Sequence, residues 1–73
     1  MADIKVESEI TGTVWKIEKG IGDQVAEDDV IMILESMKME IPVLAPESGR
    51  IKTLHIDEGA NVSEGQLVAT LET

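Results

Sequence analysis

Short apolar runs separated by polar and glycine-bearing segments are the main pattern of this chain. Residues 30–34 form one such run, and residues 41–44 form another. Two apolar runs of this length with few residues between them are typical of a β-hairpin. Near the start, Ile4 and Val6 alternate with polar residues, as in a strand with one buried face. No segment keeps a helical period over three turns, so the pattern predicts an all-β fold.

The sequence also contains an internal repeat. A shift of 37 positions places Gly12 on Gly49 and aligns residues 12–35 with residues 49–72 without a gap. Six of the aligned positions are identical, and conservative apolar pairs lie between them. Two repeats are too few for a solenoid, so we expect two half-domains related by a pseudo-two-fold axis.

Each repeat predicts the same order of elements, namely a strand, a glycine-bearing turn, a very short strand and a second long strand. The first strands cover residues 12–17 and 49–56, the turns 20–23 and 57–60, the short strands 25–26 and 62–63, and the second long strands 30–35 and 67–72. Further strands at residues 3–7 and 40–44 bring the total to about eight. We therefore expect residues 1–73 to form a single domain, a flattened barrel or sandwich of two four-stranded antiparallel sheets.

Composition fixes the character of the core. Cysteine is absent, so neither disulfides nor thiolate metal sites can stabilise this short chain. Trp15 is the only aromatic residue. The core must therefore be aliphatic, built from Ile, Val, Leu and Met, most of which suit a pleated surface.

The charge balance restricts the partners. Six Lys and Arg residues stand against 15 Asp and Glu residues, which gives a net charge of −9. Nucleic acids and anionic membranes are normally bound through Lys and Arg clusters, so both are excluded as expected partners. A strongly acidic small protein stays soluble, and it is steered toward basic patches on larger proteins. The start of the chain shows no signal-peptide pattern, and we expect a cytoplasmic monomer.

The inventory of reactive residues argues against an enzyme. The only histidine is His55, so neither a Cys–His pair nor a histidine metal cluster can form. The acidic run at residues 27–29 lacks the spacing of a calcium loop, and we interpret it as a solvated turn. Residues 20–22 begin like a phosphate-binding loop, but Val25 stands where a third glycine would fall and no helix follows.

The most informative segment lies between the two apolar runs of the predicted hairpin. It reads Glu35-Ser36-Met37-Lys38-Met39 and places one lysine between two methionines at the tip. This run resembles the Glu-Ala/Ser-Met-Lys-Met signature of biotinyl carrier domains, in which the central lysine receives biotin on its ε-amine. In the related lipoyl domains the lysine is typically preceded by Asp and followed by Ala, which is not the pattern here.

The resemblance covers essentially the whole chain and implies both a fold and a function. The fold would be the barrel-sandwich hybrid of that family, with the modified lysine on a hairpin at one end and both termini at the other. Lys38 would be the attachment point for biotin, and Met37, Met39 and Glu35 would help a biotin protein ligase to recognise it. The biotin would carry a carboxyl group between biotin carboxylase and carboxyltransferase components.

A lysine ε-amine is protonated at neutral pH and is no nucleophile until it loses that proton. We therefore interpret Lys38 as the substrate of a ligase that brings an activated acyl group, and the chain as a carrier rather than an enzyme.

Three questions stay open at the level of sequence. Lipoate, attached by a lipoate ligase, is conceivable because the resemblance extends to lipoyl domains. The chain could instead be an acidic protein-binding module that uses the same fold without modification. It resembles small free-standing attachment proteins most closely, since it lacks the protruding segment and the Ala/Pro-rich extension of some bacterial carriers. An excised domain of a larger carboxylase is the other interpretation.

Overall fold

The computed structural model describes residues 2–73 and contains β-strands without helices in that range. In chain order the strands are β1 (Asp3–Glu7), β2 (Gly12–Ile17), β3 (Gln24–Val25), β4 (Val30–Ser36), β5 (Met39–Leu44), β6 (Gly49–Leu54), β7 (Asn61–Val62) and β8 (Leu67–Glu72). No helix long and apolar enough to cross a bilayer occurs in the described part of the chain.

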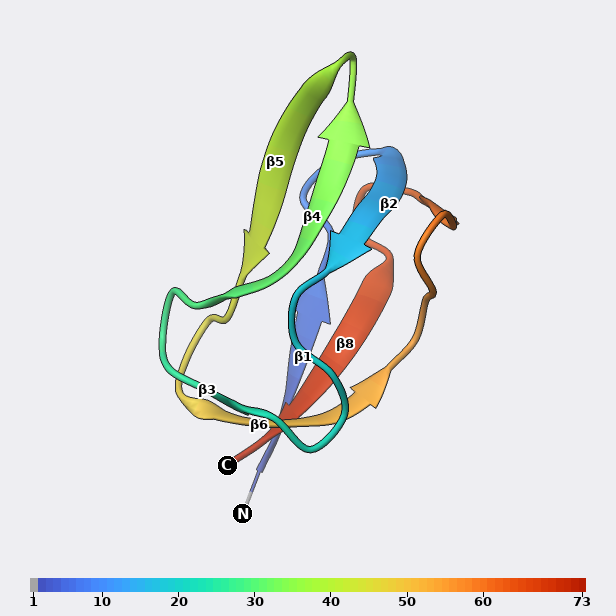
Figure 1. The fold of residues 1–73 in the computed structure, drawn as a ribbon. Coiled ribbons are helices and arrows are strands. Elements are labelled where there is room, and N and C mark those ends of the chain that lie inside the picture. Colours follow the sequence, from blue (N-terminus) through green and yellow to red (C-terminus); the bar gives the residue numbers. More distant parts are fainter. Residues whose placement is uncertain (1) are drawn as a thin grey trace.

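The strands form two four-stranded antiparallel sheets, which confirms the predicted fold class. The order is β1-β8-β6-β3 in one sheet and β5-β4-β2-β7 in the other. The sheets are flattened and do not close into a barrel, and the molecule is elongated, with extents of 36 × 17 × 17 Å. The β4–β5 hairpin projects at one end, and both chain ends lie at the opposite end (Figure 1), as the family resemblance implied.

The two halves of the chain exchange their short strands. β3 lies between β2 and β4 in the sequence, yet it pairs with β6 in the other sheet. β7 in turn pairs with β2. Each half of the chain therefore supplies two strands to each sheet.

The pseudo-two-fold relation extends further than the sequence repeat indicated, because it also relates β1 to β5. The Ser8 N–H donates to the carbonyl oxygen of Gln66 over 2.9 Å, and at the equivalent place the Ala45 N–H donates to that of Asp29 over 2.8 Å. Ser8 and Ala45 are both buried. The 37-residue shift therefore relates nearly the whole of the described chain.

Several predicted boundaries were wrong by one or two residues. β6 ends at Leu54 rather than at residue 56, and both short strands begin one residue earlier than predicted. β4 continues to Ser36 and β5 already begins at Met39, because these two residues pair with each other. Only two residues remain in the turn between them.

A β-bulge explains the spacing of apolar residues in β2. Val14 is paired with Leu34 and Lys16 with Ile33, so Trp15 is the extra residue at this point. A bulge places two residues of one strand opposite one residue of its partner. The side chain of Val14 therefore points into the core, whereas Trp15 is 51% exposed.

The core lies between the two sheets and is aliphatic, as the composition predicted. Buried residues come from both halves, often at equivalent positions, and they comprise Val6, Val14, Val25, Ile31, Met32, Leu34, Val43, Ala45, Ile51, Val62, Val68, Ala69 and Leu71. The one buried polar residue among those described is Ser8, whose hydroxyl donates to the carbonyl oxygen of Ile10.

We predict that Leu34→Ala and Leu71→Ala each lower the free energy of unfolding by about 2 to 5 kcal/mol, because both side chains are fully buried and each substitution leaves a cavity. Chemical denaturation of the two variants measures this loss. Glu47→Ala, at an exposed position, serves as the control and should stay within about 0.5 kcal/mol of the parent. Small losses for both leucine variants would contradict the placement of the core.

Candidate functional site at the β4–β5 turn

The β4–β5 turn holds its two residues in a backbone conformation that L-amino acids rarely adopt. Met37 has φ = 53° and Lys38 has φ = 65°. Positive φ at both central residues is what a two-residue type I′ hairpin requires, and Asn-Gly is the usual choice there. For other residues the left-handed conformation costs roughly 1–2 kcal/mol each. The sequence therefore places Met37 and Lys38 in a turn that Asn-Gly would form at a lower conformational free energy.

The turn is also exposed to solvent. Met37 is 92% exposed and Met39 is 63% exposed, and Lys38 is exposed between them. Within residues 2–73, no carboxylate lies within ion-pair distance of the Lys38 Nζ atom. A hollow beside β5 is lined by residues such as Ile10 and Ile41, and Lys38 is not among its lining residues. The amine therefore projects into solvent and is not enclosed in a catalytic cleft.

Below the turn, the hairpin is attached to the start of β2. The hydroxyl of Ser36 donates to the carbonyl oxygen of Thr11 over 3.0 Å. A Cβ added at Gly12 would lie 2.5 Å from the carbonyl oxygen of Glu35, so only glycine permits this approach of the two strands. The strand residues next to the turn are therefore held in place by the start of β2, which fixes the position of the exposed lysine.

Glu35, the acidic residue of the motif, lies in β4 directly opposite Glu40 in β5. Both side chains are exposed. The structure therefore brings together Glu35, Met37, Lys38 and Met39 on one hairpin, as the sequence predicted. Glu40 was recognised as a neighbouring carboxylate but was not among the predicted site residues, and its place opposite Glu35 follows once the turn is known to have two residues.

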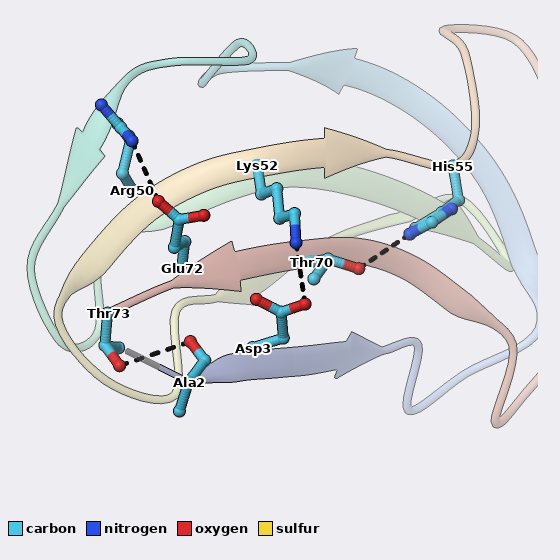
Figure 2. A network of polar contacts seen from close by, with 8 residues as sticks. All are labelled: Ala2, Asp3, Arg50, Lys52, His55, Thr70, Glu72 and Thr73. Atoms are coloured by element: carbon cyan, nitrogen blue, oxygen red, sulfur yellow. Dashed lines mark hydrogen bonds and ion pairs between the residues drawn. The ribbon is translucent and has the colours of Figure 1, made fainter.

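A polar network on the other sheet contains two further cations, Arg50 and Lys52 (Figure 2). Arg50 Nη2 lies 3.0 Å from Glu72 Oε1, and Lys52 Nζ lies 2.9 Å from Asp3 Oδ2. The hydrogen bond and charge of Asp3 raise the pKa of Lys52 above its ordinary value. A raised pKa means that the contribution of this pair to stability is present below the ordinary lysine pKa and is lost as the pH rises through the higher value.

His55 belongs to the same network and shows a structural role. Its Nε2 atom lies 2.8 Å from the Thr70 hydroxyl, which comes from the adjacent strand β8 (Figure 2). The residue is exposed and follows β6 directly, rather than lying within the strand as predicted. The hydrogen bond fits the interpretation of His55 as a surface residue.

The acidic run and the Gly20–Gly22 segment both form turns. The Asp29 carboxylate accepts a hydrogen bond from the Ala26 N–H over 2.8 Å, and that of Asp23 accepts one from the Gly20 N–H over the same distance. Among residues 2–73, no group of three or more His, Cys, Asp or Glu residues is placed to hold a metal ion.

Comparisons with known proteins agree with this geometry. The family described as "Biotin-requiring enzyme" matches residues 4–71. The biotin/lipoyl attachment protein of Bacillus subtilis is 41% identical over 66 residues, which cover 90% of each chain. The biotin carboxyl carrier protein of Streptococcus mutans is 37% identical over 60 residues, which cover 82% of this chain and 46% of that protein. This chain therefore belongs to the biotin/lipoyl attachment domain family.

Solved structures show the same relationship in three dimensions. The urea carboxylase of Kluyveromyces lactis contains a region that matches 99% of this chain with a TM-score of 0.93 and 35% sequence identity. The match covers only 6% of that enzyme. The fold of this chain is thus also found as a small part of a much larger carboxylase.

We predict that replacing Met37-Lys38 with Asn-Gly raises the free energy of unfolding by about 1 kcal/mol, because these residues adopt positive φ at little cost. Chemical denaturation with a two-state fit measures the gain. The control is Met37→Ala, which keeps a Cβ in the turn and should give no such gain. A loss of stability in the Asn-Gly variant would mean that the Met37 and Lys38 side chains themselves stabilise the hairpin.

Proposed function

We propose that this chain is a biotin carrier, modified on the ε-amine of Lys38 by a biotin protein ligase. The observation that carries the proposal is the exposed, left-handed turn that presents Lys38 between Met37 and Met39. A catalytic lysine would need neighbours that remove its proton, whereas an acceptor lysine needs access and a fixed position. The turn offers both of these.

Once biotinylated, the carrier moves a carboxyl group between the active sites of biotin carboxylase and carboxyltransferase components. Relatives that are named pyruvate carboxylase and urea carboxylase support this role, since each includes a region similar to this chain. Attachment to a protein domain converts the encounter of a free cofactor with these sites into an effectively local one. The carrier itself performs no bond-breaking step.

We predict that Lys38→Arg abolishes biotinylation and changes the free energy of unfolding by no more than about 0.5 kcal/mol, because the side chain is exposed and outside the core. Intact-mass measurement after incubation with biotin, ATP and a biotin protein ligase reads the modification directly. Lys52→Arg, on the other sheet, is the matched control and should still be modified. A biotin adduct on the Lys38→Arg protein would move the site elsewhere.

Lipoate is the second group that this site could accept, because the fold is shared with lipoyl domains and no bulky or charged residue beside Lys38 repels a lipoate ligase. Discrimination between two ligases often needs such a repelling element. We predict efficient biotinylation and weaker, detectable lipoylation of Lys38, with Met37→Asp and Met39→Ala together shifting the balance toward lipoate. Parallel reactions with the two ligases, read by intact mass, measure the ratio. If neither version gains lipoate, the flanking residues do not control the choice.

An acidic protein-binding module is the alternative function, and its net charge of −9 is the observation that favours it. Such a module would keep its binding activity after Lys38→Arg. The intact mass of the parent chain after the ligase reaction distinguishes the two functions, because the module gains no adduct.

A further inference from the structure

The two sheets present different outer faces at positions that the pseudo-two-fold axis relates. On the sheet that contains β8, Arg50 pairs with Glu72 and Lys52 pairs with Asp3, over 3.0 and 2.9 Å (Figure 2). Each of these two carboxylates therefore has a cation supplied by the same molecule. Exposed pairs of this kind contribute little stability, but they neutralise the charge of the face.

The 37-residue shift shows what the other sheet has at these four positions. Asp3 corresponds to Glu40 and Glu72 corresponds to Glu35, and these two glutamates lie directly opposite each other on β5 and β4. Arg50 corresponds to Thr13, and Lys52 corresponds to Trp15. Like charges directly opposite each other on neighbouring strands are unfavourable, and within residues 2–73 neither glutamate has an ion-pair partner. This sheet thus keeps the two carboxylates of its twin without the two cations that pair with them. Lys16, the cation of β2, instead pairs with Glu18 over 3.4 Å.

The rest of this face is more apolar than its twin. Ile33 and Pro42 are paired across β4 and β5, Trp15 is 51% exposed, and Leu44 is 43% exposed. The equivalent positions on the other sheet are polar or charged. In the same order as Ile33, Pro42, Trp15 and Leu44, they are occupied by Thr70, Lys5, Lys52 and Glu7. We call the set Trp15, Ile33, Glu35, Glu40, Pro42 and Leu44 the hairpin face. Exposed tryptophan beside aliphatic residues is typical of protein interfaces, where Trp and Arg are enriched.

The hairpin face is continuous with the turn that carries Lys38. The Glu35–Glu40 pair lies two residues behind the turn on each strand, which corresponds to about 7 Å. An enzyme that acylates the unmodified lysine must approach its amine closely, because a lysine side chain reaches only a short way beyond the backbone. Such an enzyme meets the flanking strands, whereas a carboxylase component receives its group from the end of a long arm.

We propose that the hairpin face is the docking surface for the biotin ligase that modifies Lys38, an inference that rests on the proposed function. The ligase would supply two basic side chains to Glu35 and Glu40, in the places that Arg50 and Lys52 fill on the other sheet. Arginine suits these places best, because its guanidinium binds carboxylates in a bidentate manner and stacks on an indole such as that of Trp15. The apolar residues of the face would be covered in the complex.

The experiment introduces onto the hairpin face the two cations that the other sheet has at the equivalent positions, Arg50 and Lys52. The double variant Thr13→Arg/Trp15→Lys gives Glu35 and Glu40 the partners that their twins have, so that they are neutralised within the molecule. The matched control Asp3→Asn/Glu72→Gln changes the net charge by the same amount on the other sheet. Steady-state biotinylation by a purified biotin protein ligase is measured for both variants and for the parent, at low and at high salt.

We predict that Thr13→Arg/Trp15→Lys raises the KM for the carrier about tenfold, with kcat within about twofold of the parent, because binding is lost but the acceptor lysine is unchanged. The KM of the variant should also depend less on salt, since fewer charges meet across the interface. The control should retain the KM of the parent within about twofold. The single variant Glu40→Gln, which removes only one charge, should raise KM about threefold.

The outcomes separate the two proposals. If the parent and the double variant have the same KM, or if the control raises KM equally, the hairpin face is not the docking surface, although Lys38 remains the acceptor. If the parent gains no biotin, both proposals are wrong. Circular dichroism checks that the double variant is folded. Should it not fold, an unchanged KM for Glu40→Gln overturns the docking surface and a raised KM supports it.

Discussion

Neither half of this chain can complete a sheet by itself, because β3 and β7 each pair with a strand from the other half. This exchange forces the two halves to share one core, to which Leu34 and Leu71 contribute at equivalent positions. A chain of 73 residues without cysteines has little apolar surface to bury and no covalent cross-link. Sharing the core makes the aliphatic residues of both halves part of one cooperative unit, which can offset the cost of holding Met37 and Lys38 at positive φ.

The same symmetry explains why the left-handed two-residue turn occurs at one end of the described molecule. In the sheet that contains β4 and β5, the pair Ser36–Met39 is followed by the two-residue turn. At the equivalent point between β1 and β8, the Thr73 N–H donates to the carbonyl oxygen of Ala2 over 3.0 Å. These two residues lie 71 positions apart in the sequence, so no two-residue turn joins them. The conformational cost at Met37 and Lys38 is therefore confined to one end. Positive φ in residues other than glycine is typically retained where a function requires it.

Much of the fold could be predicted from the sequence, because alternation, turn residues and the repeat all report on local structure. The bulge in β2 could not, since it depends on pairing with a distant strand. Once the bulge at Trp15 is known, the spacing of Val14 and the outward position of Trp15 follow from it. The symmetry between β1 and β5 was missed because the two strands share only two identities, Ile4 with Ile41 and Val6 with Val43. For the site, the motif predicted the hairpin tip, but the register that sets Glu40 opposite Glu35 required the length of the turn.

Comparison of the two halves separates residues that maintain the fold from residues that define the site. Gly12 and Gly49 serve the same purpose, since a Cβ at either position would lie within 3 Å of a backbone carbonyl oxygen. Glu35 and Glu72 are identical by sequence, yet only Glu72 has a cation from its own molecule. Identity between repeats therefore does not imply an equal role for a surface residue, because the role depends on what lies across the sheet. The missing cations beside Glu35 and Glu40 are explained by Thr13 and Trp15, two positions that a motif centred on Lys38 does not include.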